Sequence, residues 1–150
     1  MSVASHPKTA RLCRLDLWLN PVFDEIIGGT PGVSLSVLPA RGDDARTLAG
    51  LQSAHAYHVS AAKDELPRQW FVNADLIAQC PDLVCVSSGG AGYDTIDVAA
   101  CTAAGIAVVN QAGGNAESVA EHTYALLLAV QRRVAESHQR LRHDTGFTRE

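Results

Sequence analysis

Residues 83–97 read Leu-Val-Cys-Val-Ser-Ser-Gly-Gly-Ala-Gly-Tyr-Asp-Thr-Ile-Asp. The leading apolar residues are typical of a strand that is buried on both faces of a parallel sheet. The glycines that follow, Gly89, Gly90 and Gly92, allow backbone angles that a side chain forbids. A turn of this kind at the carboxyl end of a strand exposes backbone N–H groups that attract a phosphate or a carboxylate. The alternative is an ordinary tight loop between a strand and a helix.

The composition fits one folded domain. The chain has 150 residues, of which 47% are hydrophobic and 19% charged, and its net charge is -4. A chain of this length buries about 70% of its unfolded surface, which is enough for one core. The absence of a basic excess argues against nucleic acid as a partner. The longest apolar run, residues 124–130, is too short to cross a bilayer, so no membrane partner is expected.

The N-terminal residues indicate where the protein acts. Residues 1–11 lack the apolar stretch of a signal peptide, so we expect a cytoplasmic protein with a disordered leader over residues 1–11. The spacings of the cysteines match no zinc or redox pattern, and reduced core thiols are expected at Cys13, Cys80, Cys85 and Cys101.

Hydrophobic periodicity divides the chain into alternating strands and helices. Apolar runs predict strands at residues 12–18, 33–38, 56–59, 83–86 and 106–109. Helical spacing and capping residues predict helices at residues 22–27, 43–52, 73–80 and 97–105. Strands that alternate with helices form right-handed parallel crossovers. The sequence therefore predicts an α/β fold, an open parallel sheet with helices on both faces.

A different pattern begins after Gly114. Asn115 is a favourable N-cap residue, Glu117 places a negative charge in the first turn, and apolar residues recur at helical spacing as far as Val134. These features predict one long helix over residues 115–143, followed by a linker over residues 144–150. The helix is longer than one small sheet needs, so an isolated chain is expected to self-associate or fray at its far end.

Three motifs resemble those of the D-isomer-specific 2-hydroxyacid dehydrogenases. They are the glycine stretch quoted above, Ala-Gly-Ile-Ala-Val-Val-Asn at residues 104–110, and Asn-Ala-Glu-Ser-Val-Ala-Glu-His-Thr-Tyr-Ala-Leu-Leu-Leu-Ala at residues 115–129. Residues 12–82 fit this family only in the order of their elements. The resemblance implies a flavodoxin-like substrate-binding domain over residues 12–114 and a helix that leads into a nucleotide-binding domain absent from this chain.

The resemblance also implies a reaction. Family members transfer a hydride between NAD or NADP and a small 2-hydroxy or 2-oxo acid, and the parent protein is expected to be a homodimer. The family's catalytic arginine, acidic residue and histidine, and its GxGxxG turn, would lie beyond residue 150. We therefore assign no catalytic residue and expect the 150-residue chain, as a truncated part of such an enzyme, to be inactive alone. The alternative is a non-catalytic flavodoxin-like module that binds a small carboxylate.

The resemblance assigns substrate contacts to several positions. Gly90, Ala91 and Gly92 form the expected carboxylate site, in agreement with the anion site indicated by the glycines themselves. Asn115 is expected to face the substrate and Val119 the nicotinamide, although Asn115 has the alternative of capping its helix only. Ser60 to Lys63 occupy the loop from which family members reach the substrate tail. Lys63 could pair there with a second substrate carboxylate, and the alternative is a solvated lysine.

Other chemistries find little support in the sequence. His55 and His58 are expected on opposite faces of a strand, which does not suit a shared metal ion. Ser87-Ser88-Gly89 lacks the GxSxG pattern of a nucleophilic serine. Neither a metal site nor hydrolase chemistry is expected.

Overall fold

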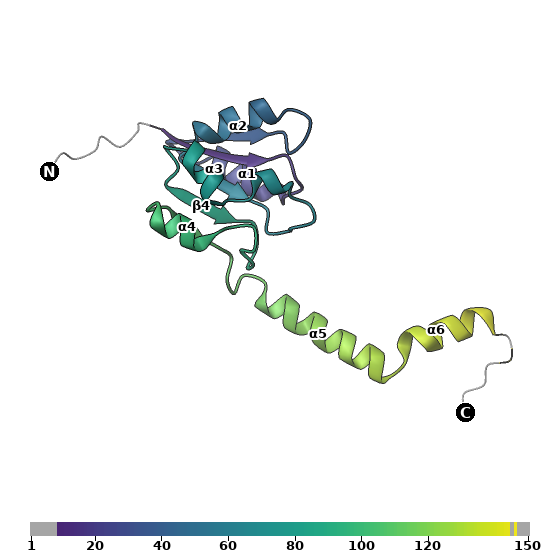
Figure 1. Cartoon of the computed structure of the whole chain (residues 1–150). Coiled ribbons are helices and arrows are strands. Elements are labelled where there is room, and N and C mark those ends of the chain that lie inside the picture. The colour runs from purple at the N-terminus through teal and green to yellow at the C-terminus, as the bar shows by residue number, and fades with distance from the viewer. Residues whose placement is uncertain (1–8, 145, 147–150) are drawn as a thin grey trace. The chain divides into compact units, whose positions relative to one another are not determined.

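The structure, a computed structural model, describes residues 9–144 and 146 (Figure 1). The chain divides into two compact units, Met1–Ala112 and Gly113–Glu150. The strands belong to the first unit, and the helices α5 (Ala116–Gln131) and α6 (Val134–His143) belong to the second.

The first unit is built on a five-stranded sheet in which every pairing is parallel and the strand order is β2-β1-β3-β4-β5. This is the order of flavodoxin-like folds, and it confirms the predicted α/β class. The strands are β1 (Ala10–Leu15), β2 (Val33–Leu38), β3 (Ala56–Val59), β4 (Cys85–Ser88) and β5 (Ala107–Val109).

The helices of the first unit begin where the sequence predicts them. Each is preceded by an Asn or Asp whose side chain accepts a hydrogen bond from a backbone N–H group of the first turn, a contact that stabilises a helix by about 1 kcal/mol. The helices are α1 (Pro21–Gly28), α2 (Asp44–Gln52), α3 (Ala74–Gln79) and α4 (Val98–Ala103), and the capping residues are Asn20, Asp43, Asn73 and Asp97.

Both faces of the sheet are covered. Phe23 of α1 stacks on His58 of β3, with the ring centroids 4.3 Å apart. The preceding residue of the strand, Tyr57, points to the opposite face. There its hydroxyl donates to the carbonyl of Trp70, at 3.3 Å. Trp70 ends η1 (Arg68–Trp70), a single 3₁₀ turn that the sequence did not predict.

The cysteines lie in or beside the core. Cys13, Cys80 and Cys101 are buried, Cys85 is half-buried, and all four are free thiols. Burial, with a smaller effect of nearby Cys80, raises the pKa of the Cys13 thiol to about 12. These thiols therefore act as small apolar groups in the core rather than as nucleophiles.

The predicted bounds of two strands, β1 and β4, are wrong at both ends, and β5 begins at residue 107 rather than 106. β1 begins at Ala10, whose N–H group donates to Gly32, so residues 10 and 11 are not part of a disordered leader; residues 1–8 lie outside the described part. β1 ends at Leu15 because the carboxylate of Asp16 turns to accept from the N–H group of Ala40, at 2.7 Å. β4 lies two residues later than predicted, and Val84 before it is 60% exposed rather than covered.

The prediction of one helix over residues 115–143 is also wrong. The N–H groups of Arg132 and Arg133 bond to Leu128 and Val130, which closes the last turn of α5. Arg133 then adopts a left-handed backbone with a φ of 52°, and α6 begins at the next residue. An interruption in the left-handed region ends the regular hydrogen-bond ladder, and neither glycine nor proline marks it in the sequence.

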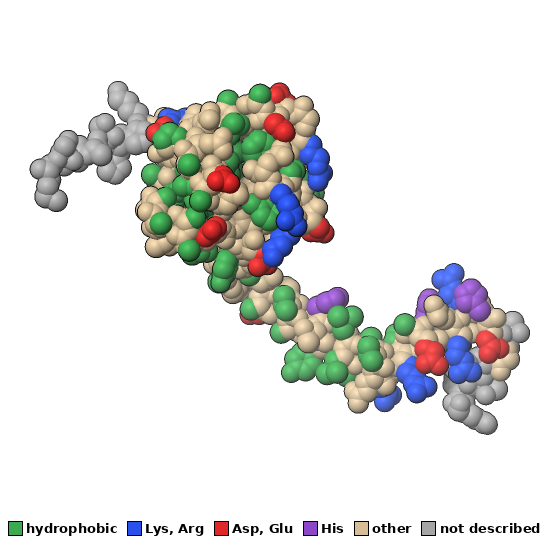
Figure 2. Space-filling model, in the orientation of Figure 1, with side chains coloured by type: hydrophobic (Ala, Val, Ile, Leu, Met, Phe, Trp, Pro, Cys, Tyr) green, Lys and Arg blue, Asp and Glu red, His purple; other side chains and the backbone are tan. Residues whose placement is uncertain are grey.

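Apolar side chains cover the surface of α5 (Figure 2). They are more than half exposed at Val119, Tyr124, Leu126, Leu127, Leu128 and Val130. A helix that is apolar on most of its surface is normally buried against other protein. In the described part of the chain, no helix has both the length and the apolar character needed to cross a membrane.

Candidate functional site

The carboxyl ends of β3 and β4 come together at one edge of the sheet. Val59 pairs with Ser88 in the ladder, and the N–H group of Gly89 donates to the carbonyl of Val59, at 2.8 Å. The chain continues from β3 into Ser60 and from β4 into the glycine turn, Gly89–Gly92. The two segments that the resemblance assigns to the substrate are therefore neighbours within the first unit.

In the glycine turn, the carbonyl groups of Gly90, Ala91 and Gly92 accept hydrogen bonds while their N–H groups stay open. The carbonyl of Gly90 accepts from the N–H of Gln111, at 3.0 Å. The Ala91 carbonyl accepts from the side-chain amide of Asn110 at 2.9 Å, and the Gly92 carbonyl accepts from the Ser88 hydroxyl.

Among residues 9–144 and 146, nothing accepts a hydrogen bond from the N–H groups of Gly90, Ala91 or Gly92. Ala91 and Gly92 are exposed, so a dissolved ligand can reach them. Backbone donors with fixed carbonyls and open N–H groups form the kind of concavity that binds an anion. The geometry thus agrees with the anion site that the glycines indicated.

The reason for the glycines differs from the expected one. Positive φ angles occur at Gly32, Gly42, Gly105 and Gly113, but not in the turn. A Cβ on Gly89 would instead lie 3.3 Å from the Val59 carbonyl oxygen, and one on Gly90 would lie 3.1 Å from the Cβ of Ala61. At Gly89 and Gly90 glycine is therefore favoured because the chain segments after β3 and β4 approach closely, not because the backbone is left-handed; a Cβ on Gly92 would meet no atom within 4 Å.

Ser60 and Lys63 lie beside this turn. The Ser60 hydroxyl accepts from the N–H of Ala62 at 3.2 Å, and the Ser60 carbonyl accepts from the Thr95 hydroxyl at 2.8 Å. The ammonium of Lys63 lies 3.6 Å from a carboxylate oxygen of Asp94. Both of these charged side chains are exposed, and such a pair is weak in water. This contact favours the solvated alternative for Lys63.

Asn115 and Val119 belong to the second unit. Asn115 occupies the N-cap position of α5, but its side chain makes no capping hydrogen bond. Its predicted position at the start of the helix is confirmed, whereas the hydrogen bond expected of a simple cap is not present. Val119, one turn later, is 54% exposed.

A polar ladder beneath α1 is a feature that the sequence analysis missed. Arg14, His58 and Ser87 are paired neighbours on β1, β3 and β4 and share one face of the sheet. The guanidinium of Arg14 binds the carboxylate of Asp24 on α1 through two nitrogens, one of them at 2.8 Å. The Nδ1 atom of His58 lies 3.1 Å from the Ser87 hydroxyl. The strand register brings these three residues together, and no pattern in the sequence links them.

The surroundings of His58 favour its neutral form. Its side chain is buried, and burial lowers its pKa, an effect that the neighbouring Arg14 increases and Asp24 opposes. The ladder borders a small cavity of about 50 Å³ at the carboxyl ends of β1, β3 and β4. Its lining residues include Arg14, Trp18, His58, Ser60 and Gly89.

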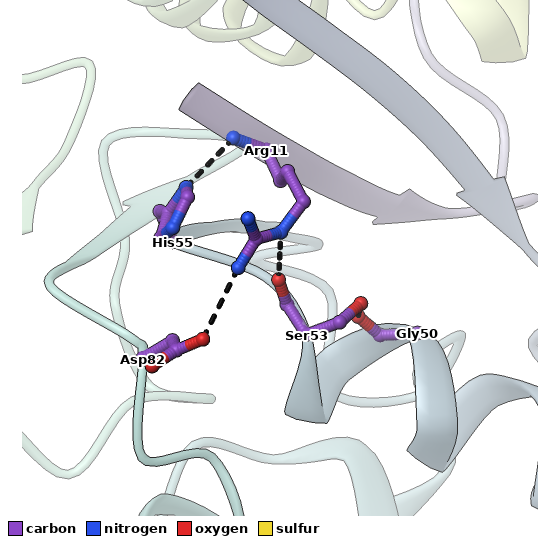
Figure 3. Close-up of polar contacts among 5 residues, drawn as sticks. All are labelled: Arg11, Gly50, Ser53, His55 and Asp82. Atoms are coloured by element: carbon purple, nitrogen blue, oxygen red, sulfur yellow. Dashed lines mark hydrogen bonds and ion pairs between the residues drawn. The ribbon is translucent and has the colours of Figure 1, made fainter. Parts of the chain in front are cut away.

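His55 makes different contacts at the opposite, amino edge of the sheet (Figure 3). Its Nδ1 atom accepts from the backbone N–H of Arg11, at 2.9 Å. The Arg11 guanidinium reaches the carbonyl of Ser53 and the carboxylate of Asp82. Within residues 9–144 and 146, no three His, Cys, Asp or Glu side chains are grouped so that they could hold a metal ion. Both histidines therefore have structural contacts of their own.

Comparisons with known proteins agree with these features. The family model of the D-isomer specific 2-hydroxyacid dehydrogenase catalytic domain matches residues 30–150, and so includes part of the region that fits by element order only. D-3-phosphoglycerate dehydrogenase of Mycobacterium leprae is 40% identical over 100 residues, which are 67% of this chain and 18% of that protein. Glyoxylate reductase of Aeropyrum pernix is 44% identical over 66 residues, 44% of this chain and 20% of that protein.

A solved structure shares the fold. The NADPH-dependent glyoxylate/hydroxypyruvate reductase from Sinorhizobium meliloti, in complex with NADP and malonate, aligns with a TM-score of 0.67 and 27% identity. The alignment covers 90% of this chain and 38% of that one. This chain spans about a fifth of the length of the curated relatives named above. The match over residues 30–150 shows that the chain belongs to the D-isomer specific 2-hydroxyacid dehydrogenase family.

Proposed function

We propose that this chain is the substrate-binding part of an oxidoreductase that transfers a hydride between NAD or NADP and a small 2-hydroxy or 2-oxo acid. One observation carries the proposal: the N–H groups of Gly90, Ala91 and Gly92 are open at the carboxyl end of β4 in a member of this family. Relatives named for phosphoglycerate and glyoxylate act on acids with a carboxylate next to the reacting carbon. A cytoplasmic location and a homodimeric parent stay predictions.

The turn would hold the substrate carboxylate and so orient the carbon beside it. The N–H groups of Ala91 and Gly92 donate to the carboxylate oxygens, and the loop from Ser60 to Lys63 borders the substrate tail. Bonds from N–H groups to a charged oxygen are stronger than neutral ones, and a fixed donor array avoids reorganisation when the ligand binds.

Asn115 and Val119 are the residues of α5 that we assign to the active site. The side chain of Asn115 makes no hydrogen bond to its own helix, which leaves it available for a substrate oxygen. Val119 is exposed and apolar, as a contact with the nicotinamide ring requires. When bound, NAD or NADP supplies or accepts the hydride. We propose that a nucleotide-binding domain outside this chain makes most of the cofactor contacts.

A second candidate is a module that binds a small carboxylate without catalysis. It is favoured by the fact that the open N–H groups and the side chains that fix their carbonyls all lie in the first unit. The two candidates share the ligand site and differ in whether a nucleotide-binding domain outside this chain completes it for catalysis.

Calorimetric titration of the 150-residue chain with glyoxylate and hydroxypyruvate tests the shared site. Ala91→Pro removes one N–H donor and should lower the affinity about tenfold or more, whereas Ala91→Ser keeps that donor and is the matched control. Absence of heat at millimolar ligand would disprove the site. Oxidation of NADH or NADPH by the chain alone, measured with glyoxylate or hydroxypyruvate present, tests whether an enzyme is complete within these residues. Both candidates predict no turnover in this assay.

A further inference from the structure

Thr95 is a buried residue that lies shortly after the glycine turn. It is 1% exposed, and its hydroxyl donates to the carbonyl of Ser60, at 2.8 Å. Its own carbonyl accepts from the N–H group of Val72, at 2.9 Å. Ser60 begins the segment that joins β3 to α3, and Val72 lies near the end of that segment. One residue therefore holds both ends of the segment that borders the candidate carboxylate site.

Backbone contacts alone hold the Val72 end of the segment. Val72 forms a parallel bridge with Ile96, and its carbonyl accepts from the N–H group of Asp97, at 2.7 Å. A residue with any side chain at position 95 can keep these contacts, because they use main-chain atoms only. The side chain of Thr95 is therefore needed at the Ser60 end.

The Ser60 end depends on the Thr95 hydroxyl. Within residues 9–144 and 146, the loop from Ser60 to Lys63 makes no backbone hydrogen bond to residues 90–97. Lys63 and Asp94 form the other polar contact between these two segments, but both side chains are exposed and such a pair is weak in water. The hydrogen bond from the buried Thr95 is sheltered from water, so it holds the loop more firmly.

The loop held by Thr95 is the surface against which the glycine turn packs. A Cβ on Gly89 would lie 3.7 Å from the Cα atom of Ser60, and one on Gly90 would lie 3.1 Å from the Cβ of Ala61. Glycine restricts its own backbone less than any other residue, so a turn built on glycines takes its conformation from its neighbours. Fixing Ser60 and Ala61 therefore confines the turn as well.

We propose that Thr95 is a positioning residue for the carboxylate site. Its hydroxyl holds the loop after β3 against the glycine turn, and so keeps the open N–H groups of Gly90–Gly92 in the arrangement that binds a carboxylate. Donors that are fixed before the ligand arrives need no ordering when it binds, so a looser loop lowers the affinity. This inference rests on the proposed function, because the turn is taken to bind the substrate carboxylate.

Calorimetric titration of the chain with glyoxylate tests the proposal. Thr95→Val exchanges the hydroxyl for a methyl group of similar size and should weaken glyoxylate binding about three- to tenfold, the effect of one hydrogen bond. Thr95→Ser keeps the hydroxyl and should restore most of the affinity.

Thr47→Val is the matched control. Thr47 is also fully buried, and its hydroxyl donates to the backbone carbonyl of Pro39, so the variant loses the same kind of hydrogen bond at the start of α2. It should lower the free energy of unfolding about as much as Thr95→Val does, yet leave the affinity for glyoxylate unchanged. Unchanged affinity in Thr95→Val, or equal weakening by Thr47→Val, overturns this proposal alone. Failure of the unaltered chain to bind glyoxylate overturns the proposed function as well.

Amide hydrogen exchange on the unaltered chain covers the case in which Thr95→Val does not fold. The N–H group of Ala62 donates to the Ser60 hydroxyl, so its exchange rate reports on the loop. Saturating glyoxylate should slow exchange at Ala62 together with exchange in the glycine turn. Glyoxylate has no tail beyond its aldehyde carbon, so slower exchange at Ala62 reports the link between loop and turn rather than a direct contact. Bound glyoxylate with no change at Ala62 means that the two segments are not coupled, and overturns the proposal.

Discussion

Trp70 should stabilise the first unit far more than the other tryptophan, Trp18. Trp70 is 4% exposed, whereas Trp18 is 86% exposed. The indole N–H of Trp70 donates to the carbonyl of Ala40 at 3.1 Å, and its own carbonyl accepts from the Tyr57 hydroxyl. Trp70→Phe removes the donor and leaves a buried carbonyl unpaired, at a cost of about 1–3 kcal/mol. The smaller ring loses about 1 kcal/mol more of apolar burial, so the free energy of unfolding should fall by about 2–4 kcal/mol.

Urea denaturation followed by circular dichroism measures this difference, because that signal does not depend on which tryptophan remains. Trp18→Phe is the matched control and should change the free energy of unfolding by no more than about 0.5 kcal/mol. The m-value should stay the same in both variants, which would show that only the midpoint has moved. Equal midpoints for the two variants would refute the claim that Trp70 ties the segment between β3 and α3 to the core.

Three further outcomes are expected. Burial lowers the pKa of His58 below its unfolded value of 6.5, so the unfolded chain binds more protons than the folded one in this pH range. The free energy of unfolding should therefore fall as the pH drops through 6.5 toward the folded pKa. His58→Phe should flatten this part of the pH profile. Gly90→Val would press its side chain on Ala61, and carboxylate binding measured by calorimetry should fall at least tenfold, while Gly28→Val, a position open to solvent, should leave it unchanged. Sedimentation should show self-association of the chain, and Leu127→Glu with Val130→Glu on α5 should shift it to monomer, because both side chains are exposed.

Much of the first unit could be predicted because its signals are local. The Asn and Asp caps before the helices each make the hydrogen bond that their sequence position indicates, and β2 and β3 have the predicted bounds. Periodicity and capping depend on residues within one helical turn of each other, so a single sequence is enough to reveal both signals. The segment between Ser60 and Asn73 depends instead on distant partners of Trp70, namely Ala40 and Tyr57, which no local pattern reveals.

The sequence predicts where the candidate site lies, but not the contacts that form it. The sequence indicated the turn at Gly90–Gly92 as an anion site, while the structure shows that Gly90 packs closely against the loop after β3 and that Gly92 does not. The sequence presents His58 only as a possible metal ligand, because its contact with Ser87 follows from the register between β3 and β4. The left-handed residue Arg133 likewise interrupts an apolar pattern that continues to Val134 and so gives no warning of a break.

The second motif of the family resemblance, residues 104–110, supports the glycine turn of the first. Residues 107–109 form β5, and Asn110 follows it. β5 pairs with β4 just before the glycine turn. Asn110 then holds the Ala91 carbonyl, and Gln111 holds the Gly90 carbonyl. Each peptide group points its N–H opposite to its C=O, so anchoring these carbonyls also directs the N–H groups of the following residues. The proposed anion site therefore depends on two adjacent strands, and a glycine turn without Asn110 would lose the contact that directs the N–H group of Gly92.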